Sequence, residues 1–455
     1  MKHVRTRKAA AIILAFLLAA TLTLGGCGIP FSPRDLPSDD ENSAENQANR
    51  ERAIIESKVN RYFKIIRDDR ESLTMFVNHM PKGADVRVRP SVVNVASAAG
   101  DTLPFTGDEY RALLVRAASQ HITYLQIIAN LTSEQIEELD TVQTRLLPDS
   151  GAGVTVNFLA AVSCDLTGAT FEQELLAAIT LCLASDRVVG ITLLPATTEE
   201  GAAEFYRQMA VIDGAYTALA QERFDEYRTE APHEVSTGGT TTQDAAAHET
   251  NTEVIEENDT PLASGTNEET AGNGEVQEPL LHISIPIDAY LMTHAVQGDG
   301  YHYIRAALEQ GHATRIEYGA SIAHEDDAYD LLTRMVDENI GVVVLPVPLS
   351  NAPDPSATDT STFALFTIVG ISVALASDGG VVQSNDMTAA FVQMVRAHDM
   401  SYKELKQLSY ASIDVSDLSA EERKELRAAL DDSFRAFEKD MAQHIDDLGL
   451  LTPGR

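Results

Sequence analysis

Short runs of β-branched and aliphatic residues alternate along the chain with stretches whose apolar residues recur at helical spacing. The runs predict eight strands, over Val86–Val95, His121–Ile128, Val154–Val162, Arg187–Leu194, Leu281–Ile287, Ala313–Tyr318, Gly341–Pro346 and Gly370–Ala376. Helices are expected between them, for example over Tyr301–Gln310, Asp326–Glu338 and Met387–His398. Strands that alternate with helices indicate βαβ units, so we expect an α/β protein with a (β/α)8 barrel of the TIM type. A doubly wound open sheet is the alternative.

A basic and then apolar leader precedes the predicted fold. Four Lys or Arg residues are followed by an apolar run over Ala9–Leu24, which is short for a membrane span and typical of an export signal. The run ends in Leu24-Gly25-Gly26-Cys27, which resembles a bacterial lipobox, so residues 1–26 are predicted to be a lipoprotein signal peptide. Cys27 would then carry the lipid that anchors the exported chain to the bacterial cell membrane or envelope. A plain signal peptide that ends near a cysteine is the alternative.

Two further segments divide the chain. Residues 27–50 are rich in Pro, Ser, Asn and Asp and are predicted to form a flexible tether. Thr229–Glu278 holds twelve Asp or Glu and no Lys, Arg or aromatic residue, so it buries too little apolar area to offset the entropy of ordering. We therefore expect a first barrel part over 51–228, a disordered acidic insertion over 229–279, between strands 4 and 5, and a second barrel part with C-terminal helices over 280–455.

Composition and charge narrow the classes of function. The 455 residues are 44% hydrophobic and 23% charged, which excludes a wholly disordered chain. The formal charge is −35, and it becomes −39 without the first 26 residues, which hold four Lys or Arg and no Asp or Glu. So acidic a surface repels phosphate backbones, and no nucleic-acid partner is expected. Cys164 and Cys182 are predicted to be buried thiols, with a disulfide between them as the alternative.

Several segments together resemble one family. Met80-Pro81-Lys82-Gly83-Ala84-Asp85-Val86-Arg87-Val88-Arg89 is similar to the Met-Pro-Lys-Gly-x-x-Leu-His-x-His strand of the adenosine deaminase family, especially its secreted growth-factor-like branch. Arg315-Ile316-Glu317-Tyr318-Gly319 resembles that family's Arg-Ile-Gly-His-Gly, and Ser377-Asp378 falls where its Thr-Asp-Asp lies. The resemblance covers about residues 55–445 apart from the insertion. It implies a barrel of the metal-dependent hydrolase superfamily, in which a divalent metal, usually zinc, activates water for deamination.

The positions that would hold the metal are mostly replaced. The resemblance places the first two ligands at Arg87 and Arg89, but a guanidinium has no lone pair to donate and stays protonated. The third ligand falls at Ile285, and only Asp378 keeps its family identity. A catalytic zinc normally takes three protein ligands, so we expect no metal and no other cofactor.

The positions for proton transfer and substrate binding are degenerate as well. Asp288 stands where the family has the Glu of His-Ala-Gly-Glu, and Tyr318 replaces the histidine that orients the attacking water. Ser91 and Gly379 replace two substrate-binding aspartates, and Pro195 falls at a glycine whose N–H contacts the purine. Since proline has no N–H to give, that contact is lost too. We therefore expect no catalytic residue.

The two arginines have more than one possible environment. If the alignment is slipped, they lie at a solvent-exposed edge; if they face the barrel mouth, Asp378 and Asp288 are the expected partners, because an unpaired buried cation is costly. In the mouth they form either a structural ion pair in the vacated metal site or a pocket for an anion.

These observations predict an exported, lipid-anchored, adenosine deaminase-like protein that is catalytically inactive and free of metal, with a binding or assembly role. Its expected partners are the membrane, through lipidated Cys27, and an anionic small ligand or an envelope protein. Two alternatives stay open. One is an active purine nucleoside deaminase or aminohydrolase with a remodelled zinc centre, and the other is a structural lipoprotein that acts through its acidic insertion.

Overall fold

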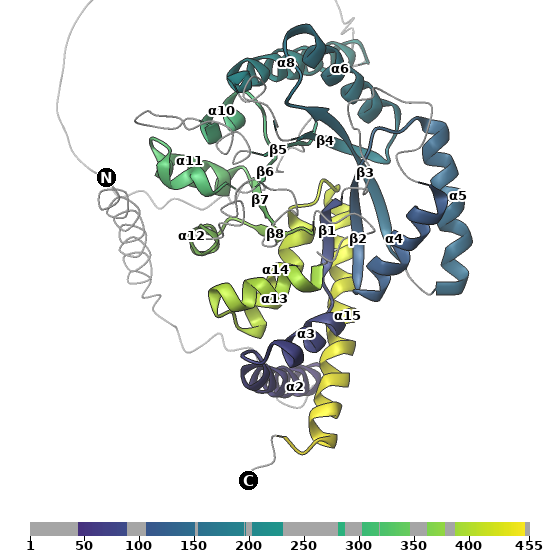
Figure 1. The fold of residues 1–455 in the computed structure, drawn as a ribbon, viewed down its shortest axis with the longest axis vertical. Helices are drawn as coiled ribbons and strands as arrows, with labels where there is room; N and C mark the ends of the chain where they lie inside the picture. Colours follow the sequence, from purple (N-terminus) through teal and green to yellow (C-terminus); the bar gives the residue numbers. More distant parts are fainter. Residues whose placement is uncertain are drawn as a thin grey trace, which may run out of the picture. The chain divides into compact units, whose positions relative to one another are not determined.

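Eight parallel strands form the centre of the protein. The computed structural model describes residues 44–88, 106–150, 153–194, 196, 203–230, 281–286, 303–317, 319–345, 362–377 and 387–450. Within these ranges the strands pair in sequence order, from β1 to β8, and form a nearly closed barrel (Figure 1). The predicted (β/α)8 fold is confirmed, and the open-sheet alternative is wrong.

Each strand overlaps its predicted run. The strands are β1 (Gly83–Val88), β2 (Ile122–Ile128), β3 (Thr155–Ser163), β4 (Val188–Leu194), β5 (Ile283–Pro286), β6 (Arg315–Glu317), β7 (Gly341–Val344) and β8 (Val373–Leu375). The amino ends differ most, by three residues, in β8, which begins at Val373 and not at Gly370, and in β1, which begins at Gly83 and not at Val86. Gly and Asp are poor strand formers, but Gly83 pairs with Ile122 and Ala84 with Tyr124, so the neighbouring strand overrides the local preference.

Helices follow most strands and continue beyond the last one. They are α2 (Ala44–Ile66), α3 (Arg70–His79), α4 (Gly107–Ser119), α5 (Ser133–Ser150), α6 (Gly168–Ala184), α8 (Phe205–Glu230), α10 (Tyr303–Glu309), the 3-10 turn η1 (Ala320–His324), α11 (Ala328–Asp337), α12 (Phe363–Val369), α13 (Met387–His398), α14 (Tyr402–Asp414) and α15 (Ala420–Asp447). The predicted helices at α10, α11 and α13 are confirmed, α13 with its predicted bounds. Helix α2 begins inside the predicted tether, because Ala, Glu, Gln and Arg between positions 44 and 52 favour a helix.

The link between α3 and β1 is held by a buried lysine. Nζ of Lys82, which is fully buried, donates hydrogen bonds to the carbonyl oxygens of Val77 at 2.7 Å, Met80 at 3.1 Å and Gln120 at 2.9 Å. These carbonyls lie at the carboxyl ends of α3 and α4, where a positive charge is favourable. Lys82 therefore fixes where β1 enters the barrel.

The seam between the first and last strands is joined by side chains. The hydroxyl of Ser377, just after β8, donates to Oδ2 of Asp85 on β1 at 2.5 Å, and the amide of Ser377 donates to Oδ1 at 3.4 Å. Both bonds are charge-assisted, because their acceptor is a carboxylate. They lie in a largely dry environment, because Asp85 is only 3% exposed.

The predicted insertion lies almost wholly outside the described residues. The chain divides into two compact units, of which the second, residues 218–278, is described only to Glu230, as the end of α8. The predicted leader is also outside the described residues. Among the helices that the structure does describe, none combines the length and apolar character needed to cross a bilayer.

Candidate functional site

A bulge in β1 turns Arg87 into the barrel. The pairing with β2 runs from Asp85↔Leu125 to Val88↔Ile127, so three steps along β1 match two along β2. The extra residue leaves Asp85 and Val88 on the outer side, where both line a hollow of about 20 Å³ together with residues of α4. Arg87 faces the inside, and its side chain is 1% exposed.

Glu317 on β6 meets Arg87 inside the barrel. Nε of Arg87 donates to Oε2 of Glu317 at 2.6 Å, and the carboxylate is 0% exposed. The other oxygen, Oε1, accepts hydrogen bonds from the hydroxyls of Ser284 on β5 at 2.9 Å and Thr192 on β4 at 3.3 Å. Three strands therefore supply donors to one carboxylate, which compensates for much of the cost of burying its charge.

A second ion pair lies two residues earlier along β6. Nη1 of Arg315 lies 3.0 Å from Oδ2 of Asp417 and donates to Oε1 of Gln126 at 2.9 Å. Nε of Arg315 donates to the hydroxyl of Ser284 at 3.2 Å, and that hydroxyl donates to Glu317. The two ion pairs are thus linked through one serine. In most barrels of this type, branched aliphatic side chains fill the same space.

The described residues do not fit a zinc ion. The resemblance places the first family ligand at Arg87, whose guanidinium is a cation already bonded to Glu317. A second cation at this point would be repelled, and the Glu317 oxygens already accept three hydrogen bonds. Across the described ranges, no three His, Cys, Asp or Glu side chains are grouped so that they could hold a metal ion.

The structure describes two of the positions that the resemblance marks. Arg87 faces the barrel interior, so for this residue the exposed-edge alternative is wrong. Ile285 lies on β5 and pairs with Ile316 on β6. The other marked positions lie outside the described residues: Cys27, Arg89, Ser91, Pro195, Asp288, Tyr318, Asp378 and Gly379.

The structure describes a partner of Arg87 that the sequence analysis does not name, Glu317. The predicted partners Asp378 and Asp288 lie outside the described residues. Glu317 stands at the first glycine of the family's Arg-Ile-Gly-His-Gly. One signal could have found it: Arg315 and Glu317 flank Ile316 at strand spacing, which puts both charges on the same face of β6.

The two thiols supply no nucleophile. Both cysteines are free, with Cys164 buried and Cys182 half-buried, so the disulfide alternative is wrong. Burial, and then the nearby charge of Asp417, raise the pKa of Cys182 to about 12. Since the thiolate is the reactive form, Cys182 is inert near neutral pH.

A second buried carboxylate follows β6 at the end of η1. Oε1 of Glu325 accepts a hydrogen bond from the amide of Ile304 at 2.7 Å, at the start of α10, and the side chain is only 6% exposed. Within the described structure Oε2 is buried without a hydrogen-bond partner. Burial raises the pKa of Glu325 to about 7, although the backbone amides at the start of α10 oppose the shift.

Glu325→Gln is expected to flatten the pH dependence of stability. Because the folded pKa is raised from 4.5, Glu325 contributes stability below about pH 4.5, and this contribution is lost as the pH rises through about 7. Glutamine keeps an acceptor for the amide of Ile304 and carries no charge. As the pH rises from 5 to 8, we expect the free energy of unfolding of the variant to increase by about 1–3 kcal/mol relative to that of the wild type, as measured by urea unfolding. The control is Glu309→Gln, a half-exposed residue on α10. Parallel pH profiles for wild type and Glu325→Gln would contradict the assignment.

The comparisons with known proteins bear on the family. Residues 280–433 match the family model described as adenosine deaminase. Over that span the chain is adenosine deaminase-like. The resemblance expected from the sequence is therefore confirmed for the part of the barrel from β5 onward. No curated protein matches the chain by sequence.

Solved structures with a similar fold include deaminases and an amidohydrolase. An amidohydrolase from Burkholderia ambifaria with bound Zn is 12% identical, covers 81% of this chain and 94% of its own, and gives a TM-score of 0.48. An adenine deaminase from Arthrobacter aurescens is 16% identical over 79% of this chain and 99% of its own, with a TM-score of 0.43. An N6-methyl-AMP deaminase from Arabidopsis thaliana is 14% identical over 79% and 98%, with a TM-score of 0.42.

Proposed function

We propose that this adenosine deaminase-like chain is a catalytically inactive, metal-free pseudoenzyme that serves binding or assembly at the bacterial cell envelope. The observation that carries the proposal is the buried Arg87–Glu317 ion pair. The resemblance to the family places Arg87 at the position of its first metal ligand. A metal-activated water needs lone-pair donors there, and a guanidinium offers none. The replacements at Ile285 and Tyr318 point in the same direction.

Attachment to the membrane is part of the proposal. It is supported by the basic and apolar leader and by Leu24-Gly25-Gly26-Cys27, which resembles a lipobox.

The charges inside the barrel bear on the class of partner. The charge of Arg87 is matched by Glu317, so the described part of the interior has no excess positive charge for an anion. We therefore favour a protein of the envelope as partner over an anionic small ligand.

The proposal predicts that the purified full-length chain contains no stoichiometric zinc and releases no ammonia from adenosine, adenine or AMP. Zinc is measured by elemental mass spectrometry after dialysis, and ammonia by a coupled assay, with an active adenosine deaminase as the positive control. A chelator is expected to leave the melting temperature unchanged, because the described residues include no group of three His, Cys, Asp or Glu side chains that could hold a metal ion.

About one zinc ion per chain that survives dialysis would overturn the proposal. So would ammonia release that requires a metal and disappears in Asp378→Ala. Either result would favour an active purine deaminase or aminohydrolase with a remodelled centre. Attachment is tested separately by the mass of the N-terminal peptide, which is expected to start at a lipidated Cys27.

A further inference from the structure

The outer side of α2 carries a stripe of basic and apolar residues. The basic–apolar stripe consists of Arg50, Ile54, Ser57, Arg61, Lys64 and Ile65, all exposed. Their spacing of three and four residues, with Ile65 beside Lys64, puts them on one side of the helix. Ile54 is 66% exposed and Ile65 60% exposed. The stripe therefore combines three positive charges with two large apolar side chains and contains no acidic residue.

The opposite side of α2 is packed, which fixes the direction of the stripe. Val59, Phe63 and Ile66 are buried, and α2 contacts α3, α14 and α15. The ring of Phe63 lies 5.2 Å from that of Phe76 on α3 and 6.1 Å from that of Tyr402 on α14. In Figure 1, α2 lies beside α3 and the carboxyl-terminal part of α15. The stripe thus belongs to a helix that cannot turn over without breaking this core.

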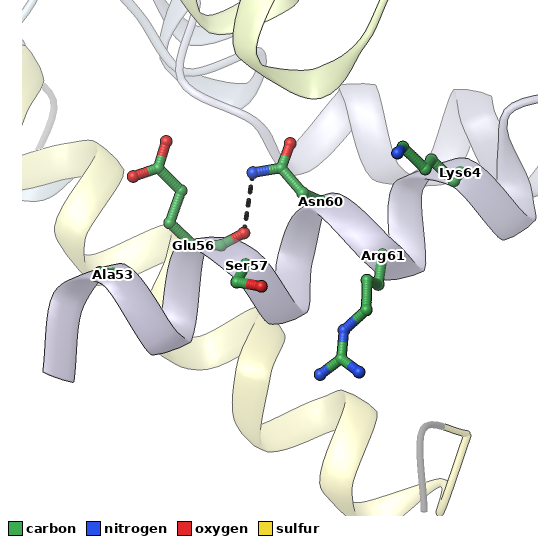
Figure 2. Close-up of a pocket in the computed structure, with 6 residues that line it drawn as sticks. All are labelled: Ala53, Glu56, Ser57, Asn60, Arg61 and Lys64. Carbon is green, nitrogen blue, oxygen red and sulfur yellow. Dashed lines mark hydrogen bonds between the residues drawn. The ribbon is translucent and has the colours of Figure 1, made fainter. Parts of the chain in front are cut away.

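Charged side chains of the stripe are available for contacts with another molecule. Arg61 and Lys64 make no hydrogen bond or ion pair with any described residue, in contrast to Lys58, which is 2.7 Å from Asp446 on α15. Together with Glu56 they line a shallow hollow of about 360 Å³, whose described walls all come from α2 (Figure 2). The side-chain amide of Asn60 in this hollow donates to the carbonyl of Glu56 at 3.0 Å.

We propose that the basic–apolar stripe of α2 docks on an anionic phospholipid surface. Its lysine and arginines complement phosphate headgroups, and the two exposed isoleucines can enter the boundary between headgroups and acyl chains. The rest of the molecule is strongly acidic, with a net charge of −35 for the whole chain, so an anionic membrane repels its other faces. The stripe is then the side that turns toward the bilayer.

The position of α2 in the chain supports this occupant. Cys27, the proposed site of lipidation, precedes Ala44, the first residue of α2, by 17 positions. A segment of this length spans at most about 60 Å when fully extended, so the start of α2 stays near any membrane that holds Cys27. The inference rests on the proposed membrane attachment for this proximity. The lipid preference of the stripe is tested independently of it.

The experiment uses the full-length chain on vesicles that contain a photoactivatable phospholipid. One set of vesicles is rich in phosphatidylglycerol and the other holds only phosphatidylcholine. Crosslinked peptides are mapped by mass spectrometry, and crosslinks to peptides that contain residues 50–65 are normalised to those of the apolar leader or of lipidated Cys27. We expect the normalised crosslinks to be at least about tenfold stronger on phosphatidylglycerol.

The charge-reversal variant Arg61→Glu/Lys64→Glu is expected to remove this preference. The matched control is Arg111→Glu/Arg145→Glu, which makes the same change of charge at two exposed residues of α4 and α5 and is expected to keep it. Equal melting temperatures show that both variants are folded. Equal crosslinking on the two lipids, or a preference that survives the reversal at α2, overturns the inference. A missing lipid on Cys27 counts against the proposed attachment and leaves the lipid preference of the stripe standing.

Discussion

Glu317→Leu is expected to lower the free energy of unfolding by about 3–5 kcal/mol, because it leaves the Arg87 guanidinium buried without its Glu317 partner. The pair joins two side chains that are 1% and 0% exposed at 2.6 Å. Ser284 and Thr192 would also lose the acceptor for their hydroxyls. The measurement is urea unfolding of the full-length chain at neutral pH, followed by circular dichroism.

The double variant Arg87→Met/Glu317→Leu tests whether the cost of Glu317→Leu comes from leaving the Arg87 charge without Glu317 or from losing the attraction between the two side chains. Removing both charges is expected to cost much less than removing Glu317 alone, since the buried guanidinium is removed together with its Glu317 partner. A matched surface control is Glu338→Leu, which breaks the exposed 2.7 Å pair with Arg334 and is expected to cost at most about 1 kcal/mol. If Glu317→Leu costs no more than Glu338→Leu, the Arg87–Glu317 pair does not hold the barrel interior together.

Gly83→Ala is expected to lower the free energy of unfolding by about 4 kcal/mol or more, by combining steric overlap with backbone strain. An added Cβ would lie 2.2 Å from the backbone oxygen of Ser409 and 2.6 Å from Oγ of Ser412. The φ angle of Gly83 is +72°, a region that alanine adopts only at a cost. Neither the α14 backbone nor β1 can move away without disturbing the hydrogen bond from the Ala84 amide to Ser412 at 2.8 Å.

Gly370→Ala provides the control for strain alone. Gly370 has a φ of +91°, but an added Cβ would meet no atom within 4 Å. We expect a cost of about 1–2 kcal/mol, measured by the same urea unfolding. Equal losses in the two variants would mean that the close approach of α14 to β1 contributes nothing at Gly83.

The polar contacts inside the barrel also bear on function. An enzyme of this fold keeps ligands and proton-transfer groups free to meet substrate, and such groups are costly to stability. In this chain the described interior positions are engaged with one another through Arg87, Glu317, Ser284 and Arg315. These contacts stabilise the barrel, and the described residues include no group of three His, Cys, Asp or Glu side chains that could hold a metal ion.

Much of the fold was predictable because it depends on local patterns. Eight apolar runs that alternate with helical patterns predict parallel strands, and the helix at Met387–His398 was bounded correctly from its periodicity. Capping boxes at Thr106/Glu109, Ser401/Glu404 and Ser419/Glu422 mark the starts of α4, α14 and α15 in the sequence itself. The start of β1 was missed because Gly83 and Asp85 act through contacts with distant parts of the chain, which no local pattern records.

The sequence by itself determined the class of fold, which needs only the periodicity of apolar residues. Its resemblance to the adenosine deaminase family also places Arg87 where that family has a metal-binding histidine, and a guanidinium has no lone pair to donate. Only the tertiary structure showed that Arg87 meets Glu317, because the two residues are 230 positions apart in the chain. A bulge in β1 and the alternation of β6 bring the two side chains together, and barrel closure makes them neighbours. The pairing is a property of three-dimensional register, which a linear pattern does not contain.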